Sequence, residues 1–191
     1  MEKQLSDVTN IKKEILENHG YNVVVGLEAE WYWEGTSKEE EEQLCTKVMA
    51  SLASKDIHIL ALSEEAAQHM WEMSLTPQTP ENAIHEFTAL KEAVMQMTQD
   101  AAKIVHLESA KPYTEKPGCG MHIHVSLQDR EGNPVFKKEG DAPETEMMLH
   151  SVGGILASMK EFLPIFIPND DSWKRITAEK NPFDEKAPLS S

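Results

Sequence analysis

The chain has 191 residues, which is enough for one domain with a sizeable hydrophobic core. Its 18 lysines and arginines are outnumbered by 33 aspartates and glutamates, so the formal net charge is -15. This balance lacks the basic footprint of a nucleic-acid-binding protein, and a content of 40% hydrophobic residues excludes global disorder. An acidic chain of this kind is either simply soluble or built to hold cations.

The N-terminus and the cysteines indicate the compartment. The stretch MEKQLSDVTNIKKEIL has no apolar signal core, and no apolar run is long enough to span a membrane. Cys45 and Cys119 lie far apart without a CxxC spacing, which favours free thiols in a reducing compartment. We therefore expect a cytoplasmic protein with no membrane partner and no nucleic-acid partner.

The first half of the chain alternates helical and strand patterns. In order, these patterns predict a helix over 5–19, a strand over 21–33, a helix over 37–54, and strands over 56–63 and 69–75. Gly20 is a C-terminal stop for the first helix, and Ser37 is an N-cap for the second. The acidic run 39–42 follows that cap, where it suits the positive end of the helix dipole.

The second half begins with the longest helical pattern, which predicts a helix from Pro80 to about Leu107. The next predicted elements are a loop over 111–120, a strand over 120–128, a turn over 129–133, a strand over 134–138 and a helix over 143–163. The last helix is expected to turn five apolar side chains inward: Met148, Val152, Ile155, Met159 and Phe162. Hairpin signals between long helices favour an α+β fold over a parallel βαβ arrangement.

In the strand VVVGLEAEWYW, two carboxylates share one face. Period two places Glu28 and Glu30 on one side and Leu27, Ala29 and Trp31 on the other. A solvated surface strand is the simpler interpretation. However, two carboxylates among apolar and aromatic neighbours repel each other unless water or a cation intervenes. A hard divalent cation such as Mg²⁺ or Mn²⁺ would resolve that repulsion.

Two further segments carry polar side chains within apolar strands. Glu72 lies in the apolar stretch HMWEMSL, an unfavourable place for an unpaired charge, and Glu64 follows the apolar run ILALS. In GMHIHVSL, three polar residues, His122, His124 and Ser126, alternate with apolar ones and share a face. A lone strand histidine is usually structural, but two imidazoles on one face can converge on a metal or an anionic ligand.

Five blocks, taken in chain order, resemble the glutamine synthetase family. GLEAEWYW looks like its metal-binding strand GxExEFxxF, and EEAAQHMWEMSL looks like HExxxGQxE, with Glu64 and Glu72 eight residues apart as its two glutamates. PENAIHEFTALKEAV resembles the helix that follows, PGCGMHIHVSL resembles GSGMHxHxSL, and NDDSWKRI resembles NSYKRL. The resemblance covers about residues 5–176. It implies a single, partial catalytic domain over 1–191, with an irregular tail from about 177 to 191.

The resemblance implies a curved antiparallel sheet flanked by helices and an ATP-dependent glutamate–ammonia or glutamate–amine ligase. Enzymes of this family form a γ-glutamyl phosphate, which ammonia or an amine then attacks. The implied cofactor is Mg²⁺ or Mn²⁺, with ATP as co-substrate, because phosphoryl transfer depends on charge neutralisation and positioning. The implied partners are glutamate, ATP, and ammonia or an amine, together with a homo-oligomer or a complementing subunit.

The resemblance also assigns roles residue by residue. The assigned positions are Glu28, Glu30, Glu64, Glu72 and His122 for metal, His124 and Ser126 for ATP, Gly118 and Arg175 for the amino-acid substrate, and Glu185 for catalysis. Among the metal ligands, Glu28 and His122 would hold the ion that bridges the nucleotide phosphates. The other three would hold the ion near the amino acid.

Several positions depart from the family pattern. His69-Met70 replaces the Gly-Gln pair of HExxxGQxE, Ser63 replaces its histidine, and Pro117 stands where asparagine is usual. The family's N-terminal β domain and its Arg-rich strand have no counterpart in the sequence. We therefore expect weak or absent ligase turnover from this chain alone. The alternatives are a catalytically inactive truncated relative that binds metal or nucleotide or assists assembly, and an unrelated HxH metal enzyme.

Overall fold

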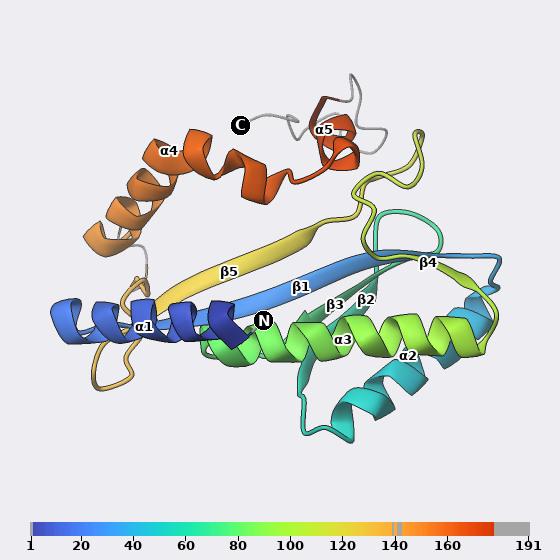
Figure 1. Cartoon of the computed structure of the whole chain (residues 1–191), viewed down its shortest axis with the longest axis horizontal. Coiled ribbons are helices and arrows are strands. Elements are labelled where there is room, and N and C mark those ends of the chain that lie inside the picture. Colours follow the sequence, from blue (N-terminus) through green and yellow to red (C-terminus); the bar gives the residue numbers. More distant parts are fainter. Residues whose placement is uncertain (1, 139, 141–142, 178–191) are drawn as a thin grey trace. The chain divides into compact units, whose positions relative to one another are not determined.

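The computed structural model of the chain describes residues 2–138, 140 and 143–177 (Figure 1). Within them, the helices are α1 (Glu2–His19), α2 (Lys38–Ala53), α3 (Pro80–Asp100), α4 (Glu146–Phe166) and α5 (Asp170–Thr177). The strands are β1 (Asn22–Glu34), β2 (Ile59–Glu64), β3 (Met70–Leu75), β4 (Ile104–His106) and β5 (Met121–Gln128). Glu185 and the tail predicted to be irregular lie outside the described residues, beyond Thr177.

The strands form one open sheet flanked by helices. Its order is β2-β3-β1-β4, and β5 pairs with β1 outside this path. The pairings of β1 with β3, of β1 with β4 and of β2 with β3 are all antiparallel. The observed architecture is therefore α+β, as the mixture of hairpin and helix signals predicts.

The chain divides into two compact units. The first comprises residues 1–26, 77–84 and 124–166, and the second comprises 27–76, 85–123 and 167–191. In the first unit, a bridge joins Val25 to Gln78 and an ion pair of 2.8 Å joins Lys12 to Glu81. These contacts connect α1, the beginning of β1 and the beginning of α3 within that unit.

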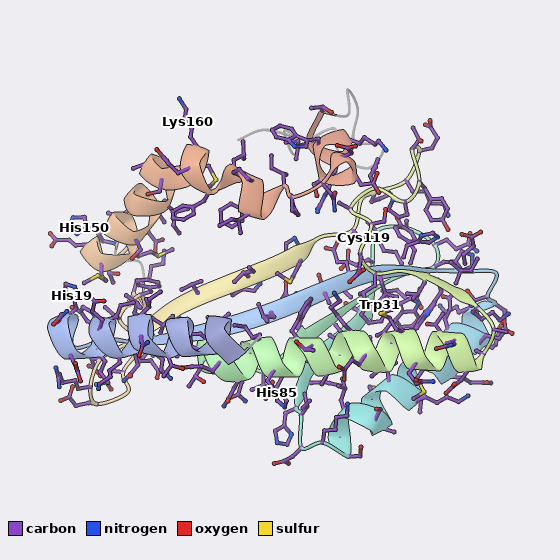
Figure 2. All side chains as sticks on the ribbon, viewed as in Figure 1. His19, Trp31, His85, Cys119, His150 and Lys160 are labelled. Atoms are coloured by element: carbon purple, nitrogen blue, oxygen red, sulfur yellow. The ribbon has the colours of Figure 1, made fainter. Side chains whose placement is uncertain are left out.

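The core of the second unit lies on one face of β1 and β3. Period two places Ala29, Trp31 and Trp33 on this face of β1. Trp31 is labelled in Figure 2, and the exposed fractions of Trp31 and Trp33 are 0% and 1%. The two indole rings pack edge to face with their centroids 5.6 Å apart. Helices α2 and α3 cover the same face with the buried side chains Leu44, Cys45, Val48, Leu52, Leu90 and Val94. The strand pattern thus selects which face the helices cover.

Local capping signals determine where the first two helices end and begin. Gly20 follows α1 with a φ of 78°, and its N–H donates to the Leu16 carbonyl at 2.9 Å. Before α2, the Ser37 N–H donates to Glu40 Oε2 at 2.8 Å, and the Glu40 N–H donates to Ser37 Oγ at 3.3 Å. This reciprocal pair is a capping box, so the predicted start of α2 is confirmed.

The predicted end of α3 at about Leu107 is wrong. The helix ends at Asp100, and Ala102 has a φ of 53°. The Lys103 N–H donates to the Thr98 carbonyl at 3.0 Å, which closes the helix end. The apolar residues that follow continue the helical spacing but form β4 instead, because they can pair with the end of β1. Tertiary pairing therefore overrides the periodic pattern.

The strand predicted over 134–138 is also absent from the described structure. Only an isolated bridge joins Pro134 to Gln128, and proline offers no N–H for a longer ladder. The turn before it does form, because Asp129 Oδ1 accepts the N–H groups of Glu131 at 3.0 Å and Asn133 at 2.8 Å. The side chain of Asp129 thus takes backbone donors that a ladder would otherwise use.

Helix α4 does not turn the predicted residues inward. It has no buried residue, and the exposed fractions of Val152, Ile155 and Phe162 are 45%, 53% and 48%. His150 and Lys160 project from the same helix (Figure 2). An amphipathic pattern shows which face is apolar, but the covering surface must come from elsewhere, and the described residues do not bury this face. Across the described part of the chain, no helix is both long and apolar enough to cross a membrane.

Candidate metal centre

Three glutamates share the face of the sheet opposite the tryptophan core. In the antiparallel pairing of β1 with β3, Glu30 lies directly opposite Glu72, and Glu28 lies opposite Ser74. Directly opposed residues point to the same side of a sheet. Because successive residues of β1 point to opposite faces, this side is the one away from Trp31. Glu28, Glu30 and Glu72 therefore face away from the two covering helices.

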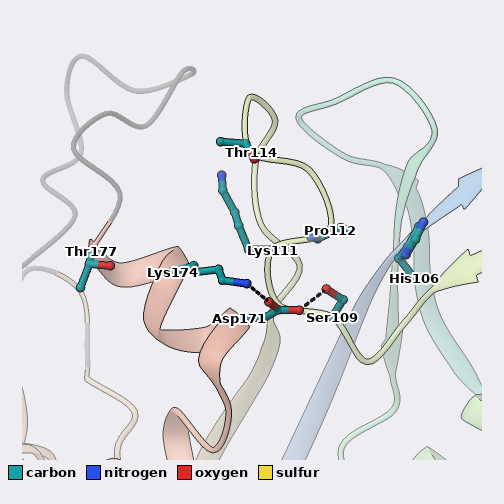
Figure 3. A pocket seen from close by; sticks show the side chains of 8 residues that line it. All are labelled: His106, Ser109, Lys111, Pro112, Thr114, Asp171, Lys174 and Thr177. Atoms are coloured by element: carbon teal, nitrogen blue, oxygen red, sulfur yellow. Dashed lines mark hydrogen bonds and ion pairs between the residues drawn. The ribbon is translucent and has the colours of Figure 1, made fainter.

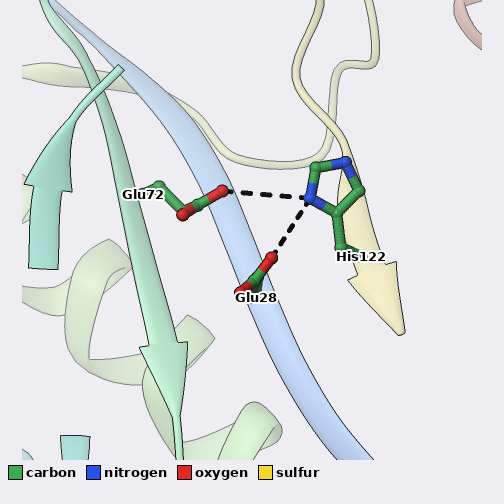
Figure 4. Close-up of side chains that lie close together, drawn as sticks. All are labelled: Glu28, Glu72 and His122. Carbon is green, nitrogen blue, oxygen red and sulfur yellow. Dashed lines mark hydrogen bonds and ion pairs between the residues drawn. The ribbon is translucent and has the colours of Figure 1, made fainter. Parts of the chain in front are cut away.

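Strand β5 adds an imidazole to this face (Figure 4). His122 Nδ1 lies 3.3 Å from Glu28 Oε2 and 3.9 Å from Glu72 Oε2. One ligand atom each from Glu28, Glu72 and His122 falls within 4.8 Å of the other two. The other oxygen of Glu28 accepts the hydroxyl of Ser74 at 3.2 Å, which orients the carboxylate. Residues from three strands that are distant in sequence thus converge on one small volume.

Glu30 is the most buried carboxylate of the group. It is only 6% exposed, and its Oε2 accepts the Gly120 N–H at 2.6 Å. The Glu30 N–H in turn donates to the Gly120 carbonyl at 3.2 Å, which connects β1 to the residue just before β5. The remaining oxygen of Glu30 lies 3.8 Å from His122 Nδ1. The backbone of the loop therefore directs this carboxylate toward the cluster.

The electrostatics of the cluster are unfavourable without a cation. Burial raises the pKa of Glu72, and the negative charges of Glu28, Glu65 and Glu30 raise it further, while His122 lowers it. Each carboxylate makes the ionised state of its neighbours more costly. Carboxylate oxygens with one imidazole nitrogen form a donor set that suits Mg²⁺ or Mn²⁺. The residues present therefore fit the cation that the sequence predicts.

Strand register separates the two adjacent glutamates of the EEAAQ stretch. Glu64 lies opposite Trp71, so it points to the core side of the sheet, and its carboxylate pairs with Lys38 at 2.7 Å. Glu65 is one of three carboxylates whose charges raise the pKa of Glu72, after burial. The structure does not bring Glu64 to the cluster. The eight-residue gap alone does not determine the face on which a strand residue lies.

The loop before β5 and helix α5 bring the predicted substrate residues Gly118 and Arg175 together. Arg175 Nη1 donates to the Cys119 carbonyl at 2.9 Å. A Cβ at Gly118 would lie 2.4 Å from the Ala110 carbonyl oxygen and 2.9 Å from Arg175 Cδ. Only glycine fits this close approach. The sequence did not predict α5, whose start is capped by the side chain of Asn169.

His124 and Ser126, predicted to contact ATP, belong to the first unit. Both lie on β5, where His124 is exposed and Ser126 is half-buried. A Cβ at Gly26 would lie 3.6 Å from the Cβ of His124, so β1 passes close to this part of β5. Their role toward a nucleotide stays a prediction.

A separate pocket of about 650 Å³ lies in the second unit (Figure 3). The Asp171 carboxylate accepts hydrogen bonds from Lys174 Nζ at 2.9 Å and from Ser109 Oγ at 2.8 Å. Both hydrogen bonds lower the pKa of Asp171, and the one from Lys174 has the larger effect. On another wall, Lys111 Nζ donates to the Lys116 carbonyl at 2.5 Å. Asp171, Lys174 and Lys111 therefore each already have a hydrogen-bond partner within the protein.

Cys119 is not a candidate nucleophile. Burial, followed by the charge of Glu30, raises the pKa of its thiol to about 12. Burial raises the pKa of Cys45 to about 12 as well. Because the thiolate is the reactive form, both thiols are inert near neutral pH.

Comparison with known sequences identifies the family. The sequence model of the family described as "Glutamine synthetase, catalytic domain" matches residues 28–183. The chain belongs to this family. Glutamine synthetase of Pyrococcus woesei is 26% identical over 185 residues, which cover 85% of this chain and 40% of that protein. The chain therefore spans about two fifths of the length of this relative.

Related ligases match a shorter segment. Gamma-glutamylputrescine synthetase of Escherichia coli is 32% identical over 66 residues, 35% of this chain and 14% of that protein. Glutamate–isopropylamine ligase of a Pseudomonas species is 37% identical over 67 residues, 35% of this chain and 15% of that protein. Similarity to this chain thus extends across a family of ligases.

Solved structures confirm the glutamine synthetase fold. A structure described as a novel glutamine synthase homolog has a TM-score of 0.80 at 18% identity, covering 92% of this chain and 44% of that one. Plasmodium falciparum glutamine synthetase has a TM-score of 0.76 at 14% identity, covering 91% and 43%. The described α+β sheet is therefore part of a larger fold in these neighbours.

Proposed function

We propose that this chain provides the metal-binding part of an ATP-dependent glutamate–ammonia or glutamate–amine ligase. The observation that carries the proposal is the convergence of Glu28, Glu72 and His122 from three strands. Membership of the glutamine synthetase family supports the reaction class. Phosphoryl transfer needs little covalent chemistry from a protein, but it needs charge neutralisation and positioning.

Glu28, Glu72 and His122 would hold Mg²⁺ or Mn²⁺. When bound, the cation would supply charge neutralisation for the phosphates of ATP. Glu30, which is buried and held by the Gly120 N–H, would add a third carboxylate oriented toward the same place. Glu64 remains a proposed ligand only if its ion pair with Lys38 is given up.

The other proposed contacts come from the family pattern. His124 and Ser126 would approach ATP. Gly118 would bring the backbone close to the amino-acid substrate, and Arg175 would pair with a substrate carboxylate, an interaction that suits the guanidinium. Glu185 is proposed as the catalytic acid. The acceptor is ammonia or an amine, since relatives named for both match the chain.

The proposed setting is the cytoplasm, in a homo-oligomer or with a complementing subunit. The relatives are more than twice as long as this chain, so other groups of the site would come from further polypeptide. A catalytically inactive relative that keeps the metal-lined sheet for binding or assembly is the alternative. The observations that favour it are the departures from the family pattern at Ser63, His69 and Pro117.

Phosphate release from ATP tests the proposal. The chain is assayed with glutamate, Mg²⁺ or Mn²⁺, and ammonia, putrescine or isopropylamine, alone and mixed with a polypeptide that supplies the relatives' C-terminal part. We expect glutamate-dependent release that is lost in His122→Ala and kept in His150→Ala, which changes an exposed histidine on α4. Release that is absent from every mixture would refute the ligase and leave the inactive relative.

A further inference from the structure

A buried carboxylate outside the cluster connects α2 to the turn before β3. Glu41 is 3% exposed. Its Oε1 accepts the hydroxyl of Thr36 at 2.6 Å, and its Oε2 accepts Trp71 Nε1 at 2.9 Å. His69 Nδ1 lies 2.5 Å from Oε1, and it is the donor because a carboxylate can only accept. Three donors from two separate segments therefore converge on this one side chain.

His69 adopts a backbone conformation that histidine rarely takes. Its φ is 70°, in the left-handed region where a side chain clashes with the following carbonyl. It occupies the position where the pattern HExxxGQxE has glycine, the residue that tolerates this conformation. Strain of this kind persists only when surrounding contacts hold it, and the hydrogen bond to Glu41 is such a contact.

The strained residue lies in turn 65–70, which joins β2 to β3. The Glu65 N–H donates to the Met70 carbonyl at 2.9 Å and closes the turn. The His69 carbonyl accepts the Trp33 N–H at 3.0 Å and connects the turn to β1. Glu72 follows the turn by two residues. The conformation of the turn therefore affects how the Glu72 carboxylate is presented to the metal cluster.

We propose that Glu41 is a positioning residue: by binding His69 and Trp71, it holds turn 65–70 and aims Glu72 at the metal. The inference rests on the metal centre proposed above. Trp71 and Glu72 are neighbours in β3 and point to opposite faces of the sheet. Glu41 therefore binds the strand through Trp71 on the core face, while the Glu72 carboxylate lies on the face of the metal cluster. Glu41 itself never contacts the cluster.

Manganese affinity measured by electron paramagnetic resonance tests this role. Glu41→Gln should weaken Mn²⁺ binding about 10-fold, which is the usual scale for groups that orient ligands indirectly. The matched control Glu42→Gln, which removes the same charge from the exposed neighbour, should stay within about two-fold of the parent. Titrations are made at low temperature, where circular dichroism shows each variant to be fully folded.

Glycine rescue separates positioning from general stability. Adding His69→Gly to Glu41→Gln should restore most of the affinity, because glycine adopts a φ of 70° without an anchor. If Glu41→Gln does not fold, His69→Ala is compared with His69→Gly, and only the alanine variant should lose affinity. Equal affinity in these variants, or a loss that glycine does not rescue, would overturn the proposal.

A measurement made without metal separates a failure of the Glu41 proposal from a failure of the proposed metal centre. In EDTA, the amide hydrogens of Glu65 and Met70 should exchange faster in Glu41→Gln than in the parent, since both close the turn. A parent protein that binds no Mn²⁺ refutes the metal centre, and the exchange rates then decide whether Glu41 holds the turn. Unchanged exchange rates would refute the anchor.

Discussion

Neutralising Glu72 should stabilise the protein in the absence of metal. The pKa of Glu72 is raised above its ordinary value of 4.5, first by burial and then by Glu28, Glu65 and Glu30. A carboxyl whose pKa is raised in the folded state contributes stability below its unfolded pKa. That contribution is lost as the pH rises through the folded pKa. At neutral pH the ionised Glu72 therefore opposes folding, and Glu72→Gln should remove the opposition while keeping the shape of the side chain.

The size of the effect follows from the spacing of the cluster. The ligand atoms of Glu28 and Glu72 lie within 4.8 Å of each other. At this separation two like charges repel by about 1 kcal/mol in water and by about 3 kcal/mol at an effective dielectric constant of 20. A change of 1 kcal/mol moves the melting temperature of a chain of this size by roughly 2–4 °C. Glu72→Gln in EDTA should therefore melt about 2–12 °C above the parent at neutral pH.

Thermal unfolding with and without Mn²⁺ checks whether Glu72→Gln is more stable than the parent without metal and less stable with it. In EDTA the advantage of Glu72→Gln should shrink as the pH falls toward 4, where the parent carboxyl is protonated. With Mn²⁺ at about 100 times its dissociation constant, the parent should gain about 2.7 kcal/mol, and the variant should gain less. The order of the two proteins then reverses. Glu42→Gln is the control, because it removes an exposed charge outside the cluster. A Glu72→Gln protein less stable than the parent in EDTA at neutral pH would contradict the reasoning.

Three further outcomes follow from the site. Glu65→Gln should weaken Mn²⁺ binding, measured by titration, more than Glu64→Gln does. The charge of Glu65 raises the pKa of Glu72, whereas Glu64 pairs with Lys38 on the other face of the sheet. A larger loss in Glu64→Gln would support Glu64 as the metal ligand. Gly118→Ala should lower the free energy of unfolding in urea by about 1–3 kcal/mol, since its Cβ would lie 2.4 Å from the Ala110 carbonyl oxygen, and an unchanged midpoint would count against the tight loop. Cys119 should react slowly with a thiol reagent at pH 8, because its pKa is raised to about 12, and rapid labelling of the folded protein would show that the thiol is accessible.

The sequence predicted the parts of the fold that local rules control. Ser37 and Glu40 form the expected capping box, and Gly20 ends α1 as expected. Period two placed Trp31 in the core and Glu30 on the opposite face, and the structure agrees. Each of these features depends on residues within a few positions of one another, so a single sequence contains the information.

Predictions failed where distant segments decide. The helical pattern through Ile104 became a strand because the end of β1 was available for pairing. The apolar face of α4 was expected to be buried, but the described residues leave Ile155 53% exposed. Periodicity identifies an apolar face and says nothing about the surface that will cover it.

Local patterns in the chain were enough to show which residue types could form the site, their order and the family to which they point. Which of these residues meet depends on strand register, which joined Glu28, Glu72 and His122 and turned Glu64 toward Lys38. A strand exposes alternate residues on opposite faces, so a shift of one position moves a carboxylate across the sheet. The left-handed His69 and its buried partner Glu41 were likewise set by packing between α2 and the turn, which no local pattern in the chain encodes.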